Sequence, residues 1–145
     1  MTTIVAITNR DMYRAAVISQ RVENDFVTGS LGSNEARDIV QNVKNKVEEY
    51  VDNHDKVLFT QDTHTEKYLD TYEGKHLPVV HCVYETEGWE VIPEIAQYQI
   101  TYNELNIGNT FHKHTFGSVE LAEEIRKLAA EAHNQKKEFL VEFIG

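Results

Sequence analysis

The sequence predicts an α/β fold in which helices cover both faces of a parallel β-sheet, a three-layer sandwich. Three observations predict it. Short β-branched runs alternate along the chain with helical patterns. Two long segments repeat apolar residues at three- and four-residue steps, as helices packed on a sheet do. One apolar run ends in polar side chains, which is where strands of parallel sheets present chemistry.

The first third of the chain predicts a strand and a helix. Residues 3–8 (TIVAIT) form a β-branched run and predict a buried strand. Residues 10–22 (RDMYRAAVISQRV) leave two alternatives open, a strand centred on AAVIS or one continuous helix. A helix is predicted from Ser33 to the turn DNHD at residues 52–55. Its apolar stripe consists of Ala36, Ile39, Val40, Val43, Val47 and Val51.

The middle of the chain predicts two further strands joined by loops. Residues 56–62 (KVLFTQD) predict a buried strand. Residues 76–86 (HLPVVHCVYET) contain a proline and predict a loop with a brief extended piece. Pro93 is expected to open a single helical turn. Residues 97–103 (QYQITYN) are a third strand candidate.

The last third predicts a helix followed by a closing strand. Residues 116–135 predict a helix capped by Ser118, and residues 137–145 (KEFLVEFIG) predict a strand. An α/β domain usually covers both faces of its last strand. We therefore expect a small sheet, a sequence shorter than its relatives, or a partner chain over this strand in a homo-oligomer or a complex. The length fits one domain over residues 1–145.

The composition restricts the partners. The chain carries 14 Lys and Arg against 24 Asp and Glu, a net charge of −10, which argues against nucleic acid or an anionic membrane as partner. A single cysteine excludes an internal disulfide and suits a reducing compartment. Neither a spanning segment nor a signal peptide is recognisable. We expect a cytoplasmic protein with a small neutral or cationic ligand.

One segment gathers metal-ligand side chains. Asp62 and His64 stand two residues apart at the end of a predicted strand, so both point to the same side. Glu73 lies within the following loop and His81 at its far end. Carboxylate and imidazole ligands of this mix suit Zn²⁺, Fe²⁺ or Mn²⁺. Spacing alone leaves a solvated polar loop as an equal alternative.

Two other candidates come from single residues. Lys113 precedes a predicted helix start and could face the crevice above the sheet to orient a carboxylate or an oxyanion. A surface lysine is the common alternative, and the flanking His112 and His114 leave a metal or proton-shuttle role open. Cys82 is the only possible thiol nucleophile, but it follows an apolar run and is expected to be a buried, inert thiol.

Three blocks of the chain resemble the nicotinamidase branch of the isochorismatase-like cysteine hydrolases. The blocks are ENDFVTGSLGSNEARDIVQNVKNKVEEY, VLFTQDTHTEKYLDTYEGKHLPVVHCVYETEGWEVIPEI and KHTFGSVELAEEI. The resemblance covers residues 23–145, whereas residues 1–20 match poorly. It implies the isochorismatase-like, Rossmann-like fold, which agrees with the elements expected above.

The resemblance also implies roles for six residues. Asp62, His64 and His81 match the metal ligands of the family, and Glu73 matches a fourth ligand of some members. In those enzymes the ion binds the pyridine nitrogen of nicotinamide. Phe26 would stack near that ring, and Lys113 matches the catalytic lysine. The implied cofactor is a divalent metal, with zinc first and iron or manganese as alternatives.

Two departures from the family pattern affect catalysis. Arg21 occupies the position of the catalytic Asp, and the sequence stops before the loop that carries the family's nucleophilic cysteine, so the family's C-terminal part is lacking. Cys82 matches a non-catalytic cysteine. We therefore expect a nicotinamidase-like amidohydrolase lineage that is inactive alone. The alternatives are a non-enzymatic ligand-binding or regulatory protein, and a metal-water hydrolase with Glu73 or His76 as base.

Overall fold

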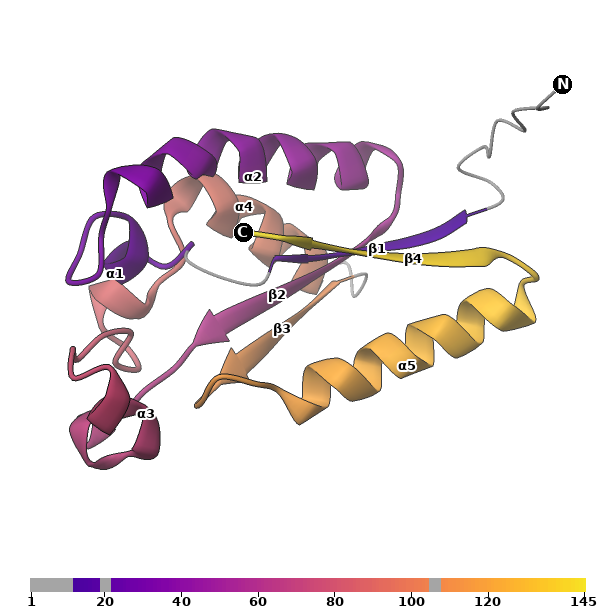
Figure 1. Ribbon diagram of the computed structural model, residues 1–145. Helices are drawn as coiled ribbons and strands as arrows, with labels where there is room; N and C mark the ends of the chain where they lie inside the picture. The colour runs from indigo at the N-terminus through magenta and orange to yellow at the C-terminus, as the bar shows by residue number, and fades with distance from the viewer. Residues whose placement is uncertain (1–11, 19–21, 105–107) are drawn as a thin grey trace, which may run out of the picture.

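A four-stranded, all-parallel β-sheet forms the centre of the protein. The computed structural model describes residues 12–18, 22–104 and 108–145. The strand order is β3-β2-β1-β4. The strands are β1 (Met12–Ile18), β2 (Lys56–Asp62), β3 (Gly108–Lys113) and β4 (Glu138–Ile144). All strands run in the same direction, so their C-terminal ends lie at one edge of the sheet (Figure 1).

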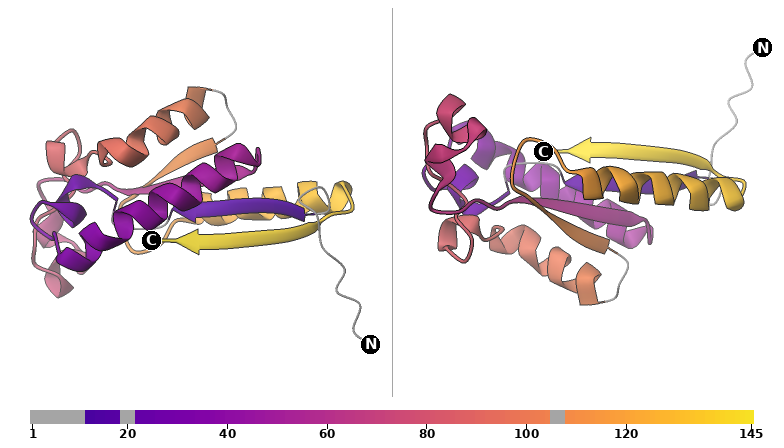
Figure 2. Two further views of the ribbon diagram at one scale, coloured as in Figure 1. Left: turned by 90° about the horizontal axis from the view of Figure 1, so that it is seen from above. Right: turned by 90° about the horizontal axis from the view of Figure 1, so that it is seen from below.

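Helices cover both faces of this sheet. Helices α2 (Asn34–Asp52) and α4 (Pro93–Glu104) lie on one face, and α5 (Val119–Asn134) lies on the other (Figures 1 and 2). The predicted three-layer α/β sandwich is therefore confirmed.

The alternation of side chains along β1 explains the two halves of the core. Ala16 and Ile18 point to the α2 face, where they join a cluster that contains Val47 and Tyr50. Ala15 and Val17 point to the α5 face, where their cluster contains Leu128. Because successive residues of a strand face opposite sides, a central strand between two helical layers must be apolar throughout.

Both long helices begin at the serines that the sequence predicts. The Ser33 side chain accepts a hydrogen bond from the Ala36 backbone N–H at 3.0 Å. The Ser118 side chain accepts one from the Leu121 backbone N–H at 3.1 Å. Each cap satisfies one of the backbone donors that the first turn of a helix leaves free.

Residues 10–22 were predicted as either a strand or a continuous helix, and the structure shows the strand: β1 spans Met12–Ile18. The strand predicted at residues 3–8 lies outside the described residues. The strand predicted at residues 97–103 was wrong, because this segment belongs to α4. β3 is the third strand instead.

Packing explains why α4 overrides the β-propensity of residues 97–103. Ile95 is fully buried and Tyr98, three residues later, packs against the same cluster. The Tyr98 hydroxyl also donates to Glu48 Oε1 on α2. A three-residue step places both side chains on one helix face, so tertiary contacts decide the conformation.

Four short helical segments lie in the loops around the C-terminal edge of the sheet (Figure 1). They are α1 (Asn24–Val27), η1 (Tyr68–Asp70), α3 (Tyr72–His76) and η2 (Glu87–Trp89). These loops carry most of the polar side chains that the sequence singles out. In parallel α/β sheets, ligands bind at this edge.

β4 forms one edge of the described sheet. Leu140 and Phe143 on this strand are 38% and 64% exposed. A partner chain covering β4 stays a prediction. Among the described residues, no helix combines the length and the apolar character that crossing a membrane requires.

Candidate functional site

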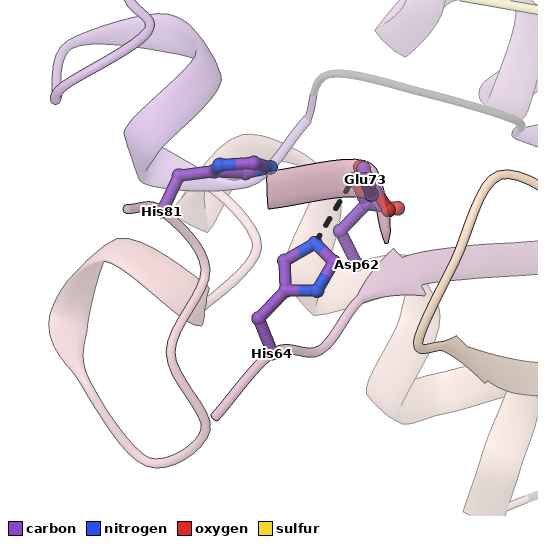
Figure 3. Close-up of side chains that lie close together, drawn as sticks. All are labelled: Asp62, His64, Glu73 and His81. Carbon is purple, nitrogen blue, oxygen red and sulfur yellow. Dashed lines mark ion pairs between the residues drawn. The ribbon is translucent and has the colours of Figure 1, made fainter. Parts of the chain in front are cut away.

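Four side chains with metal-ligand chemistry meet beyond the C-terminal end of β2. One nitrogen or oxygen atom from each of Asp62, His64, Glu73 and His81 lies within 4.8 Å of the others. Figure 3 shows the four side chains directed toward one another. Asp62 ends β2, His64 follows two residues later, Glu73 lies in α3 and His81 lies in the loop after it. The structure thus brings together all four ligands that the sequence predicts.

A capped turn and a glycine position Glu73. The Thr71 side chain accepts the Gly74 backbone N–H at 3.0 Å and so begins α3. A Cβ atom at Gly74 would lie 2.0 Å from the Tyr68 carbonyl oxygen and 2.8 Å from Leu69 Cα. Only a glycine fits at this position, because backbone atoms leave no room for a side chain. α3 therefore packs directly on η1, and Glu73 points into the cluster.

Backbone pairing brings the two histidines together. The His64 N–H donates to the Cys82 carbonyl, and the Tyr84 N–H donates to the His64 carbonyl, each at 2.9 Å. This bridge places the rings of His64 and His81 with their centroids 4.8 Å apart. His81 Nδ1 lies 2.6 Å from the Val79 carbonyl oxygen and donates to it. In a neutral imidazole this bond leaves the lone pair on Nε2, which is the arrangement of a metal-ligating histidine.

The environment of the cluster fits a cation. His64, Glu73 and His81 are 4%, 7% and 2% exposed. Within the described part of the chain, His64 Nε2 and Glu73 Oε2 are buried without a hydrogen-bond partner. His64 Nε2 lies 4.0 Å from the other carboxylate oxygen, Glu73 Oε1. Buried polar atoms are normally paired, so two unpaired atoms on neighbouring side chains of one cluster point to a group that would join them. A divalent ion accepts both an imidazole nitrogen and a carboxylate oxygen.

The protonation states agree with this fit. Burial, followed by the nearby His81, lowers the pKa of His64 and favours the neutral imidazole that binds metals. Burial, followed by the charge of Asp62, raises the pKa of Glu73. Both pKa shifts reflect the free-energy cost of a charge that is buried and lies near a group of the same charge. A bound cation would relieve that cost for Glu73.

Lys113 lies beside the cluster. It ends β3 and pairs in register with Asp62 at the end of β2. Its Nζ atom is 3.2 Å from Asp62 Oδ1, and Lys113 is only 8% exposed. Of the two alternatives that the sequence left open for Lys113, the structure therefore shows the one in which its side chain faces the crevice and not the bulk solvent.

A pocket of about 150 Å³ opens over the cluster. The Phe26 ring forms one wall and meets the His81 ring edge to face, with centroids 5.4 Å apart. Leu77, Thr115 and Phe116 also line the pocket, and sequence analysis missed them. Thr115 and Phe116 lie two and three residues after the end of β3, so the rule that strand ends carry function could have found them once β3 was placed.

Other candidates lie outside this pocket. His112 and His114 both direct Nδ1 at Thr63, at 3.2 Å from its hydroxyl and 2.9 Å from its carbonyl oxygen. His76 is exposed and its Nδ1 lies 2.8 Å from the Tyr72 carbonyl oxygen. Neither the flanking histidines nor the expected base His76 lines the pocket. Arg21 lies outside the described residues.

Cys82 has the properties of a structural thiol. It is fully buried, and its Sγ atom contacts the Gly88 carbonyl oxygen at 3.8 Å. Burial, with a smaller effect of the Glu23 charge, raises the pKa of its thiol far above the usual range. A nucleophilic cysteine requires an accessible thiolate. The Cys82 side chain is not accessible, and its raised pKa disfavours the thiolate.

Glu23 is a buried acid that sequence analysis missed. It is 2% exposed, and its Oε1 accepts the Asp62 backbone N–H at 2.7 Å. Burial raises its pKa to about 7. The sequence shows only a carboxylate between Val22 and Asn24, which a single sequence does not distinguish from a turn residue.

Comparison with known families decides the classification. The family model described as Isochorismatase domain matches residues 15–133 of the 145. The chain belongs to the isochorismatase family. A comparison with curated protein sequences gave no significant match.

Solved structures share the isochorismatase fold with this chain. The nicotinamidase/pyrazinamidase of Bacillus subtilis superposes with a TM-score of 0.71 at 20% identity, covering 90% of this chain and 84% of that one. The pyrazinamidase/nicotinamidase of Streptococcus mutans gives 0.67 at 20% identity, with 88% and 83% covered. The pyrazinamidase of Pyrococcus horikoshii, solved in complex with zinc, gives 0.61 at 20% identity, with 92% and 71% covered. At these identities the comparison establishes the fold.

Proposed function

We propose that this chain holds one divalent metal ion at Asp62, His64, Glu73 and His81 and binds a small aromatic amide such as nicotinamide above it. One observation carries the proposal: four ligand atoms lie within 4.8 Å of one another, and three of the four residues, Asp62, Glu73 and His81, line a pocket. The unpaired His64 Nε2 and Glu73 Oε2 support a cation there. Several structural neighbours are nicotinamidases or pyrazinamidases, which supports the ligand class.

Zinc is the proposed ion, with iron and manganese as alternatives. Two imidazoles and two carboxylates suit Zn²⁺, which binds nitrogen and oxygen at four positions or expands to five. The zinc complex of the Pyrococcus horikoshii pyrazinamidase supports this choice. A bound ion would supply Lewis acidity toward a ring nitrogen.

The surrounding side chains would orient the amide. Phe26 presents an apolar ring at the pocket wall, against which a flat aromatic ligand can pack. Lys113 presents a cation to the same pocket and can donate to the amide oxygen. Phe116 is 63% exposed and contributes an apolar rim. The combination favours a small, flat molecule with one polar amide group.

We further propose that this chain alone binds the amide without hydrolysing it. Thioester chemistry requires a thiolate in the pocket, and the one cysteine of the sequence is the fully buried Cys82. Hydrolysis by a metal-bound water would need a separate base. His76 does not line the pocket, and Glu73 belongs to the ligand set. The geometry therefore favours a ligand-binding role over the metal-water alternative.

Metal and ligand titrations test the proposal. We expect the purified chain to bind about one Zn²⁺ and the zinc-loaded chain to bind nicotinamide. The His64→Ala variant should lose both zinc binding and nicotinamide binding. The His133→Ala variant, changed at the end of α5, should keep both. No ammonia should be released from nicotinamide. Unchanged zinc content in His64→Ala would contradict the site, and ammonia release above the blank would contradict the binding-only role.

A further inference from the structure

We propose that Glu23 and Asp25 are positioning residues for the metal centre. Neither belongs to the four-ligand cluster. Each accepts a backbone N–H from a segment that carries a ligand, Glu23 from the end of β2 and Asp25 from the loop that contains His81. The proposal rests on the proposed function, because it concerns how that metal site is held.

Glu23 supplies a hydrogen-bond acceptor beyond the last described pair of β2 and β1. The described pairing of β2 with β1 ends at Phe59, while pairing with β3 continues to Asp62. The Thr63 N–H donates to the Lys113 carbonyl on the β3 side at 2.7 Å. Because successive N–H groups of a strand point to opposite sides, the Asp62 N–H points toward β1. Glu23 Oε1 accepts it at 2.7 Å.

This bond matters for the direction of the Asp62 side chain. The backbone of Asp62 is held on one side through β3 and on the other side by Glu23. With both sides fixed, the carboxylate is directed at the cluster and at Lys113. Without Glu23, the Asp62 N–H loses the acceptor that it has on the β1 side in the described part of the chain. A buried N–H would also be left without an acceptor, which is costly.

Asp25 holds a strained backbone. Its Oδ2 accepts the Cys82 N–H at 2.7 Å. Cys82 has φ 46°, a left-handed conformation that costs a non-glycine residue about 1 kcal/mol or more. In this conformation the Cys82 carbonyl accepts the His64 N–H, while His81 remains in the cluster. One carboxylate thus supports the segments of two ligands.

Two glycines leave space for the Asp25 carboxylate. A Cβ atom at Gly88 would lie 2.3 Å from Asp25 Oδ2, and a Cβ atom at Gly29 would lie 2.4 Å from Asp25 Oδ1. Any side chain at Gly88 must therefore push the carboxylate away from Cys82. This contact makes the position of Asp25 testable without replacing Asp25 itself.

Zinc affinity, measured by competition with a chromophoric chelator, tests the proposal. We expect Glu23→Ala and Asp25→Ala to bind zinc at least about 10-fold more weakly than the wild type, the usual cost of losing a group that orients a ligand. Glu23→Gln and Asp25→Asn keep an acceptor oxygen and should stay within about 3-fold of the wild type. The absorption of the Co²⁺-loaded protein should change in the alanine variants only.

Matched controls separate positioning from general destabilisation. Glu131→Ala removes a carboxylate that accepts the Tyr13 hydroxyl at 2.7 Å and should leave zinc affinity unchanged. Gly88→Ala should weaken zinc binding about as much as Asp25→Ala, whereas Gly117→Ala, with no atom within 4 Å of the new Cβ, should not. Circular dichroism shows whether each variant is folded. If Asp25→Ala is unfolded, the zinc affinity of Gly88→Ala tests the role of Asp25 in its place. If Glu23→Ala is unfolded, Glu23→Asp, which withdraws the carboxylate by one methylene, tests the role of Glu23.

The outcomes distinguish the two proposals. If the wild type binds no zinc, the proposed function fails and the positioning roles fail with it. If the wild type binds zinc and the folded Glu23, Asp25 and Gly88 variants bind it equally well, only the positioning roles are overturned. Weak binding in the alanine variants with recovery in Glu23→Gln and Asp25→Asn supports them.

Discussion

Asp62 Oδ1 lies 3.2 Å from Lys113 Nζ, and the two residues occupy paired positions at the ends of β2 and β3. The same carboxylate belongs to the four-ligand cluster. Asp62 is therefore shared between a fixed cation and a candidate metal ion. Among the residues that the structure describes, Lys113 supplies positive charge beside the carboxylates of this crevice in the metal-free protein.

Lys113→Met should destabilise the metal-free protein and make it more dependent on zinc. Breaking a largely buried pair leaves the Asp62 charge uncompensated, so we expect the free energy of unfolding to fall by about 1–3 kcal/mol. A bound divalent ion restores positive charge. The rise in melting temperature on zinc addition should therefore be larger in the variant than in the wild type, as measured by calorimetry.

Lys46→Met provides the control for this prediction. Lys46 also forms an ion pair, with Glu142 at 3.1 Å, but its side chain is 42% exposed. Exposed pairs contribute little, so the variant should lose less than about 1 kcal/mol and keep the wild-type response to zinc. Equal zinc responses in Lys113→Met and Lys46→Met would contradict the shared role of Asp62.

Gly74→Ala should damage the metal site through the backbone. The new Cβ would lie 2.0 Å from the Tyr68 carbonyl oxygen, so α3 must move away from η1 and carry Glu73 with it. We expect zinc affinity to fall about 10-fold or more, by analogy with other losses of ligand orientation. Isothermal titration measures the effect. Gly117→Ala is the matched variant without close neighbours, and a similar loss there would count against the explanation.

Phe26→Ala should separate ligand binding from metal binding. The ring packs against His81 and lines the pocket, but it offers no ligand atom. We expect nicotinamide to bind about 10-fold more weakly, the value of an aromatic contact, while zinc affinity stays within about 3-fold. Phe143→Ala, which removes a 64% exposed ring from β4, should change neither affinity. Unchanged nicotinamide binding in Phe26→Ala would remove this residue from the ligand site.

The pKa of Glu23 predicts a pH-dependent stability of the metal-free protein. Burial raises this pKa from 4.5 to about 7, so between these values the folded state binds more protons than the unfolded state. The stability that this group contributes is present below about pH 4.5 and is lost as the pH rises through about 7. The full loss corresponds to on the order of 3 kcal/mol.

Urea unfolding of the wild type and Glu23→Gln between about pH 5 and pH 8 measures this contribution. Glu23→Gln should gain stability relative to the wild type as the pH rises. The lowered pKa of His64 acts in the opposite direction, since it destabilises the fold as the pH falls below its ordinary value, but it is common to both proteins. Parallel pH profiles would show that Glu23 does not titrate in this range.

Cys82 should resist thiol reagents in the folded protein. Its side chain is fully buried and its thiol pKa is raised by burial, so the reactive thiolate is scarce and inaccessible. We expect Ellman's reagent to react with Cys82 only after unfolding in guanidinium. Fast labelling of the native protein would contradict the structural role of this residue.

Local patterns were sufficient for much of the fold. The three- and four-residue repeats of α2 and α5 and the serines that cap them need only neighbouring residues, so periodicity predicted both helices. The same holds for β2 and for the side-by-side placement of Asp62 and His64 at its end, which follows from strand geometry. Residues 97–103 show where local propensity fails, because contacts of α4 with α2 override it.

Local sequence patterns were thus enough to predict most of the α/β elements and the ligand-type residues after β2. Tertiary contacts were needed to show that Lys113 pairs with Asp62 and that Glu23 and Asp25 accept hydrogen bonds from the segments that carry the ligands. These bonds join residues far apart in the chain, such as Asp25 and Cys82, 57 positions apart. Their geometry depends on the strand order and on glycines that leave space for a carboxylate. Local periodicity in the sequence predicts neither of these features.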